Sequence, residues 1–354
     1  MGTVKQLTRD CEGCCFHATG PIADAVRRVE PRAQGEPLCL WGVAVKRLVG
    51  EPETHCRLNR QKATGTWLER IQSSQVPGRP PLRYFGSKWR LAPWIAAHFP
   101  AHKCYVEPFG GGLSVLLRKP PSTFEFVNDL DDVVVTFFRV LRERPLDLLR
   151  AIERTPFARR EFEFAREPVA DGDELEIARR LYVRAWQGRG GLRTQWKTGW
   201  RVWKHDVRDR PPPADFLDTS HLEIVARRLR TVAIDCDDGL NIIRRYDSAE
   251  TMFYVDPPYL AEVRSVRWRR KAYALEFDRP QDHERLARAL QRVRGMVVLS
   301  GYPSPLYESL YEARGWQRRT LEANTESGMR TEALWFNPAA VARGIHPQME
   351  LFDG

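Results

Sequence analysis

The chain has 354 residues, of which 42% are hydrophobic, and this is enough for one large α/β domain with smaller attachments or for about two domains. No stretch approaches the roughly 18 to 20 apolar residues that a membrane-spanning helix needs, and the N-terminus lacks the apolar segment of a signal peptide. We therefore expect a soluble, cytoplasmic protein without membrane contact. The net charge of +10 indicates an anionic partner, with nucleic acid as the first candidate.

Residues 1–76 form a Cys-rich N-terminal extension that contains five of the seven cysteines. A segment with so small an apolar core favours a stabilising metal, and four thiolates are available for a structural zinc ion, namely those of Cys11, Cys14, Cys39 and Cys56. Against this, 16 residues separate the second pair, and Cys15, His17 and His55 are rival ligands. The alternative is a loosely ordered extension with free thiols.

The Pro/Gly-rich stretch 76–82 marks a boundary, after which elements of alternating type begin. A turn precedes an amphipathic helix with Leu91, Trp94, Ile95 and Phe99 on one face. Residues 104–119 then predict a strand, a glycine turn and the start of a helix, and further along the chain a strand at 124–129 precedes a helix at 130–143.

Residues 144–230 are mostly helical in pattern, interrupted at 186–213, and strands and helices alternate again from residue 231. Strands are expected at 231–236, 251–256, 295–302 and 330–337, and helices at 238–247, 280–293 and 304–315. The alternation predicts an α/β fold, a Rossmann-like doubly wound sheet with a helical, basic insertion in its middle.

The sequence Glu107-Pro108-Phe109-Gly110-Gly111-Gly112 follows the first strand of this sheet, where glycine lets the backbone approach a ligand. It is not a dinucleotide fingerprint, because Val115 stands at the third glycine position, and no Gly-Lys-Ser/Thr of a P-loop follows. Asp129 ends the next strand, where an acid can accept hydrogen bonds from both ribose hydroxyls. Together they indicate a nucleoside ligand without pyrophosphate, such as S-adenosylmethionine; a tight turn beside a solvated Asp is the alternative.

The strand 251–256 ends in Asp256-Pro257-Pro258-Tyr259, where the prolines end the ladder and fix the backbone. A carboxylate and a proline carbonyl that accept both N–H bonds of an exocyclic amine would favour a pyramidal nitrogen with a free lone pair. Tyr259 can stack on the base. This suits amine methylation on a flipped base; an Asp-Pro turn that caps the strand, with Tyr259 in packing, is the alternative.

These motifs, in this order, resemble the Dam-type (D12 class) N6-adenine-specific DNA methyltransferases over about residues 82–340, and the phage-type members most closely. The resemblance implies that Tyr84 and Lys88 contact the methionine end of the cofactor and that Asp235 contacts its adenine. Cys236 stands where many relatives carry an aromatic residue. The other implied cofactor-binding residues are Glu107, Pro108, Phe109, Gly110, Gly112, Asp129 and Asp256.

Between Arg179 and Arg210 ten Lys or Arg residues stand against two Asp, with four tryptophans interleaved. Such residues neutralise phosphates, and Arg also reads guanine edges. The family places target recognition here, and the loop 261–271 adds five more basic residues after the Asp-Pro-Pro-Tyr turn. Core packing of at least two tryptophans and a merely solvated loop are the alternatives. The expected DNA-binding residues are Arg189, Arg193, Lys197, Arg201, Lys204, Arg267 and Arg269.

The sequence therefore predicts four parts: the extension 1–76, a cofactor-binding part 82–143, a helical target-recognition insertion 144–230 and a catalytic part 231–345. We expect a monomer, acting in a bacterial or phage-infected cell, that methylates adenine N6 in double-stranded DNA. Cytosine N4 is the close alternative, because the same turn serves both exocyclic amines. A catalytically idle DNA-binding protein and an RNA or protein methylase are more distant alternatives.

Overall fold

The computed structural model describes residues 76–169, 172–192, 199–201, 211–259, 277, 279–325 and 328–345, together with two short strands near the N-terminus. The chain divides into two units between Ser73 and Ser74. In the first unit, strand β1 (His17–Ala18) pairs antiparallel with β2 (Leu38–Cys39). The second unit carries all the other described elements.

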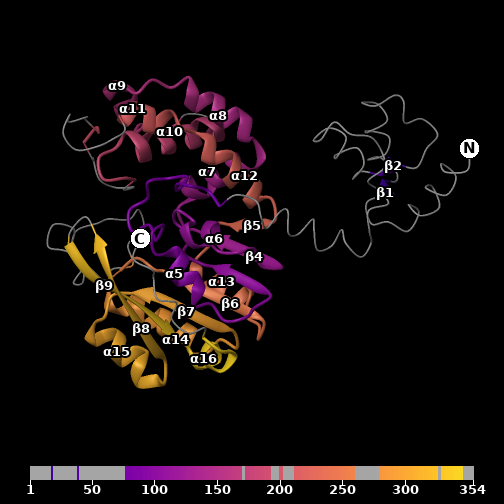
Figure 1. Ribbon diagram of the computed structural model, residues 1–354, viewed down its shortest axis with the longest axis vertical. Helices are drawn as coiled ribbons and strands as arrows, with labels where there is room; N and C mark the ends of the chain where they lie inside the picture. Colours follow the sequence, from indigo (N-terminus) through magenta and orange to yellow (C-terminus); the bar gives the residue numbers. More distant parts are fainter. Residues whose placement is uncertain are drawn as a thin grey trace, which may run out of the picture. The chain divides into compact units, whose positions relative to one another are not determined.

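A seven-stranded mixed sheet organises the second unit, with the strand order β5-β4-β3-β6-β7-β9-β8 (Figure 1). The first five strands run parallel, and β9 is antiparallel to both β7 and β8. Their bounds are β3 Cys104–Glu107, β4 Phe124–Asn128, β5 Val232–Asp235, β6 Thr251–Val255, β7 Met296–Gly301, β8 Gln317–Thr325 and β9 Gly328–Phe336.

The strand order reverses at β3, because β4 and β5 follow on one side of it and β6 and β7 on the other. At such a reversal the connections leave the carboxyl ends of neighbouring strands in opposite directions and open a crevice there. The carboxyl ends of β3 and β6 therefore lie where this class of sheet binds its ligands.

Helices cover both faces of the sheet. Successive residues of the buried strands point to opposite faces and belong to two separate hydrophobic clusters, one on each face. Tyr254 of β6 belongs to one cluster and Phe253 to the other. The first face packs against α5 (Ala92–Ala97), α6 (Ser114–Arg118), α7 (Asp132–Glu143), α12 (Ser220–Leu229) and α16 (Pro338–Arg343). The second packs against α13 (Gly239–Arg245), α14 (Pro280–Leu290) and α15 (Pro305–Leu310).

A group of helices lies between α7 and α12, at one end of the second unit (Figure 1). They are α8 (Pro145–Glu153), α9 (Arg159–Phe164), α10 (Glu174–Gln187) and α11 (Pro212–Leu217). α10 packs along α7, and its Tyr182 and Trp186 are buried in the same core cluster as the first face of the sheet. These helices are thus continuous with the main core.

The prediction of an α/β chain is confirmed, and the long strand and helix patterns match the observed elements. Strand β8 was missed because its residues 317–320 are all exposed, so no apolar alternation marks them. The helix expected at 304–315 is α15 followed by a 3₁₀ turn at Glu312–Arg314. Among the described helices, none has the length and apolar character needed to cross a membrane.

Candidate active site

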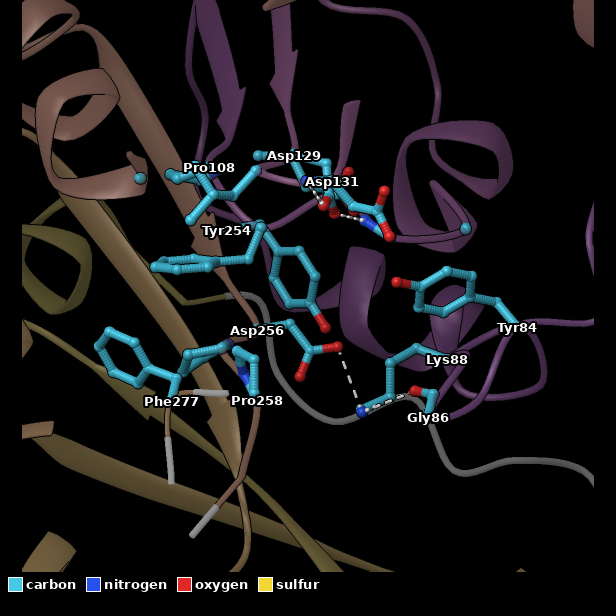
Figure 2. A pocket seen from close by; sticks show the side chains of 18 of the residues that line it. Tyr84, Gly86, Lys88, Pro108, Asp129, Asp131, Tyr254, Asp256, Pro258 and Phe277 are labelled. Atoms are coloured by element: carbon cyan, nitrogen blue, oxygen red, sulfur yellow. Dashed lines mark hydrogen bonds and ion pairs between the residues drawn. The ribbon is translucent and has the colours of Figure 1, made fainter. Parts of the chain in front are cut away.

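A cavity of about 290 Å³ opens at the carboxyl ends of β3, β4 and β6, at the reversal of strand order (Figure 2). Several separate segments build its walls. Its lining comprises residues 84–88, 107–112, 114–115, 129–131, 238–239, Tyr254, 256–258, Phe277, Asp282 and Arg285. In Figure 2, Tyr84 and Lys88 face Tyr254 and Asp256 across the cavity.

The glycine turn after β3 forms one wall, and its shape requires glycine. A Cβ atom on Gly110 would lie 2.9 Å from the carbonyl oxygen of Asn128, whose position is fixed by the Gly110 N–H that donates to it at 2.7 Å. Gly111 has a φ of +49°, and its N–H donates to Oδ2 of Asp129 at 2.7 Å. Leu113 also has a positive φ of 53°, which is uncommon outside glycine. The turn therefore stores backbone strain beside the cavity.

Two carboxyl groups in this wall are held in an environment that disfavours their charge. Glu107 is 2% exposed, and burial raises its pKa to about 8, against the opposing hydrogen bond from the Tyr105 hydroxyl at 2.7 Å. The pKa of Asp129 is raised to about 6 by desolvation, although the N–H groups of Asp131 and Gly111 donate to it. Perturbed carboxyl groups of this kind gather at functional sites.

The turn after β6 places Asp256 on the opposite wall, with a hydrogen-bond donor on each carboxylate oxygen. The hydroxyl of Tyr259 donates to Oδ1 at 2.9 Å, and Nζ of Lys88 lies 3.2 Å from Oδ2. The same ammonium lies 4.6 Å above the centre of the Tyr259 ring, and Tyr302 packs edge-on against that ring with centroids 4.8 Å apart. Asp256 and Tyr259 are thus pre-positioned as one unit with Lys88.

Comparison with known proteins adds the observation that decides the family. The sequence profile of the D12 class N6 adenine-specific DNA methyltransferase family matches residues 84–320, about two thirds of the chain. The chain belongs to this family. It is also 24% identical over 264 residues to the Type II methyltransferase M.MjaIII of Methanocaldococcus jannaschii, an alignment that covers 66% of this chain and 88% of that protein.

The protein is therefore an adenine-specific DNA methyltransferase, with DNA as its substrate and the S-adenosylmethionine of its family as cofactor. The cavity fits this cofactor chemically. Six carboxyl groups and only two cationic side chains line it, which suits a ligand that carries a sulfonium and an ammonium charge. No lysine stands at the glycine turn to bind a phosphate. When bound, the cofactor supplies a methyl group on its sulfonium.

Most of the cofactor-binding residues expected from the sequence meet around the cavity of the methyltransferase. They come from four separate segments of the chain. They are Tyr84, Lys88, Glu107, Pro108, Phe109, Gly110, Gly112, Asp129 and Asp256, joined by Pro257 and Pro258 of the expected catalytic turn. Tyr259 lies outside the lining, because its ring is only 8% exposed behind Lys88 and Tyr302.

Asp235 and Cys236 are not brought to the cavity of the methyltransferase. Asp235 forms an ion pair with Nη1 of Arg245 at 2.5 Å, and Cys236 is exposed. Asp238 and Gly239, a few residues later, line the cavity instead. A Cβ on Gly239 would lie 2.8 Å from the Phe109 ring, so this close packing explains the glycine.

The sequence reasoning also missed Phe277, Asp282 and Arg285, which close the cavity from the side of α14. Phe277 packs edge-on against Phe109 with centroids 5.9 Å apart, and Arg285 lies 3.8 Å from Asp238. No local pattern marks these three residues. Asp238 did carry a signal, because an Asp before a helical run is a typical N-cap, and its side chain accepts a hydrogen bond from Leu240 N.

Two of the expected DNA-binding residues of the methyltransferase lie within the described residues. Arg189 is exposed. Arg201 is 8% exposed, and its Nη1 pairs with Asp215 at 2.7 Å, so a structural role explains it better than a phosphate contact. Arg193, Lys197, Lys204, Arg267 and Arg269 lie outside the described residues.

The structure gives the zinc prediction no support. Within the part of the chain that it describes, no group of three or more His, Cys, Asp or Glu side chains could hold a metal ion. The expected ligands Cys11, Cys14 and Cys56 lie outside the described residues, and of Cys39 only its place in β2 is described. The structural zinc ion stays a prediction.

Proposed function

We propose that this methyltransferase binds S-adenosylmethionine between the glycine turn and residues 84–88, and receives a flipped adenine of duplex DNA at the Asp256–Tyr259 turn. The observation that carries the assignment is the meeting of both sets of residues around one cavity. Asp129 lies at the end of β4, where a ribose would reach its carboxyl. Tyr84 and Lys88 belong to residues 84–88, which suit the methionine end.

The Asp256 turn has the groups that an exocyclic amine needs. The Tyr259 hydroxyl and the Lys88 ammonium already contact its two carboxylate oxygens, which supports a role for Asp256 as a hydrogen-bond acceptor in this geometry. A carboxylate and the Pro257 carbonyl that each accept one N–H of the amine would localise the nitrogen lone pair. Because prolines fix this backbone before the base arrives, little ordering remains for binding.

The ammonium group of Lys88 occupies the position that the proposed target base would take at Tyr259 and Asp256. Its ammonium lies over the Tyr259 ring and beside Oδ2 of Asp256, so it contacts the same two groups that would stack on and bind the adenine. The carbonyl of Gly86, 3.2 Å from Nζ, is an acceptor that stays with Lys88 when it withdraws. Entry of the base therefore replaces one donor at Asp256 by another, and the carboxylate is never left unpaired.

The helices between α7 and α12 are proposed as the DNA-binding part of the enzyme. Arg189 is exposed at the end of α10, next to the chain that forms the wall of the cavity. Of the other expected basic residues, Arg193, Lys197 and Lys204 follow α10 in sequence, and Arg267 and Arg269 follow the Asp256–Tyr259 turn. Phosphate contacts from such residues would make binding strongly dependent on salt.

The assignment is tested by methylation of unmodified genomic DNA, followed by digestion and mass spectrometry of the nucleosides. Asp256→Asn keeps the size of the side chain but loses its charge, and we expect the methylation rate to fall by about 100- to 1,000-fold, against a loss of cofactor affinity of at most about tenfold. Tyr259→Phe keeps the ring and loses one hydrogen bond, so a loss of about tenfold is expected. A wild-type rate in folded Asp256→Asn, or N4-methylcytosine as the product, would contradict the proposal.

A further inference from the structure

A strap of ten residues, 79–88, runs from the helices between α7 and α12 to the cofactor cavity. Its first half is bound to those helices. The Arg79 guanidinium lies 3.9 Å above the Trp186 ring and pairs with Asp215 and Asp218 at 3.1 and 3.3 Å. The indole N–H of Trp186, which is buried, donates to the carbonyl of Pro81 at 3.0 Å.

The second half of the strap is part of the cavity wall. All five residues from Tyr84 to Lys88 line it. The Tyr84 side chain packs on the glycine turn so closely that a Cβ on Gly111 or on Gly112 would lie 3.1 Å from it. Ser87 Oγ is 2.7 Å from Ser114 Oγ at the start of α6. A ligand in the cavity would therefore contact the strap directly.

Between these halves, the strap is hydrogen-bonded to the chain that follows α10. Leu192 N donates to the carbonyl of Arg83, Phe85 N donates to that of Leu192 at 3.2 Å, and Tyr84 and Leu192 form a parallel bridge. Gly191 has a φ of +82°, and a Cβ on it would lie 2.5 Å from the Arg83 carbonyl oxygen. Only glycine allows this approach.

The same chain carries the exposed Arg189. Residues 187–189 pair with 199–201: Arg189 N donates to the carbonyl of Gly199 at 2.9 Å, and Arg201 N donates to that of Gln187 at 2.8 Å. Gln187 is fully buried and bonded to the Pro156 carbonyl, so this pairing is anchored in the core. Leu192 therefore connects the strap at Tyr84 with the paired residues 187–189 and 199–201. A displacement of Tyr84 would be transmitted to this pairing through the hydrogen bonds of Leu192.

We propose that the Gly191–Leu192 bridge to the strap is the positioning element that makes DNA affinity depend on an occupied cofactor cavity. The inference rests on the proposed function, since it takes the cavity as the cofactor site and the chain after α10 as part of the DNA-binding region. Coupling of two ligands is reciprocal, so each must change the affinity of the other by the same factor. Backbone hydrogen bonds suit this coupling because, unlike side-chain contacts, they cannot be relieved by a change of side-chain rotamer.

The test compares DNA dissociation constants with and without saturating S-adenosylhomocysteine, on a duplex that the wild-type enzyme methylates. Gly191→Ala is the test variant. Gly315→Ala is its matched control, because Gly315 has a nearly equal φ of +83° but nothing within 4 Å of an added Cβ. We expect a coupling factor of about fivefold or more in the wild type and in Gly315→Ala, and a factor near 1 in Gly191→Ala.

Affinity for S-adenosylhomocysteine alone should change by less than about threefold in Gly191→Ala, which separates lost coupling from a damaged cavity. If this variant does not fold, Trp186→Phe removes the bond to Pro81 and should lower the factor in the same direction. Wild-type coupling in a folded variant of either kind, or a wild-type factor of 1, would overturn the inference. A wild-type enzyme that binds no DNA would overturn the proposed function itself.

Discussion

The amino end and the carboxyl end of the parallel strands each bury a glutamate, but the pKa of one is lowered and the pKa of the other is raised. Glu125, near the amino end of β4, is 3% exposed and contacts Lys119 at 2.6 Å and Arg228 at 2.5 Å. Burial alone would raise its pKa, but the hydrogen bonds and charges of Arg228 and Lys119 bring the pKa below the ordinary value. Its charge is fully compensated within the protein.

Glu107, at the carboxyl end of the neighbouring strand β3, is equally buried, yet no ion pair to it is found among the described residues, and its pKa is raised to about 8. Hydrogen bonds from Tyr105 and Leu116 satisfy it only in part. We infer that the amino end contributes to stability, whereas the carboxyl end suits the cationic ligand proposed above. Four predictions test this contrast.

The largest effect is expected at the amino end, in Glu125→Gln. The substitution leaves Lys119 and Arg228 buried without their counter-charge, so we expect a loss of about 3 to 5 kcal/mol in the free energy of unfolding. Urea denaturation at pH 7 measures it, with Glu153→Gln on the surface of α8 as the control, expected within about 0.5 kcal/mol of the wild type. A cost below about 1 kcal/mol for Glu125→Gln would mean that the charge is not compensated there.

The carboxyl end should respond with the opposite sign. The folded-state pKa of Glu107, about 8, lies above its ordinary value of 4.5, so the folded state binds the proton more tightly. Its contribution to stability is complete below pH 4.5 and is lost as the pH rises to about 8. Glu107→Gln removes this loss, and we expect the variant to gain roughly a few kcal/mol over the wild type at pH 8 but little at pH 4.5. Urea titrations at the two pH values that show equal differences would contradict this.

Binding of the cofactor should release protons. A cationic ligand near Glu107 and Asp129 lowers the pKa of both carboxyl groups, and at pH 7 it is Glu107 that still carries a proton in the folded state. Calorimetry of S-adenosylmethionine binding in two buffers of different ionisation enthalpy should therefore report release of about one proton. Glu107→Gln should abolish the release. Proton uptake by the wild type would show that the cavity does not receive the ligand as described.

The smallest effect separates two neighbouring acids of the β5–α13 connection. Asp235 is paired with Arg245 away from the cavity, so Asp235→Asn should leave cofactor affinity unchanged within about twofold. Asp238→Asn keeps the N-cap oxygen for Leu240 but removes a charge from the lining, so we expect roughly a tenfold loss. Isothermal titration measures both. The reverse order would support the sequence-based assignment of Asp235 as the contact to the cofactor adenine.

The sequence predicted those parts of the fold and site whose physical cause is local. The buried strands were readable from runs such as 251–255, and the glycine turn and the Asp256 turn from residues that only such backbones need. Strand β8 was not readable, because pairing with β9 rather than burial of its own side chains holds it in place. Arg285 and Phe277 reach the cavity through the packing of α14, which no local pattern encodes.

The burial of Arg201 shows the same limit for charge. In sequence it is one of ten basic residues in a basic stretch, but its ion pair with Asp215 depends on how α11 packs beside α10. The positive charge of a segment therefore predicted a DNA-binding region. Whether a given arginine is exposed or buried in an ion pair could be read only from the tertiary structure.

The central claim is that adenine is methylated at the carboxyl end of the parallel strands, where Glu107 is buried. It is tested most directly by long-read modification sequencing of plasmid from a methylation-deficient host that expresses the wild-type enzyme or Asp256→Asn. The account predicts N6-methyladenine at one short motif with the wild type and none with the variant. Unmodified plasmid from a host whose wild-type protein is folded and binds S-adenosylmethionine, or equal modification by the variant, would contradict it.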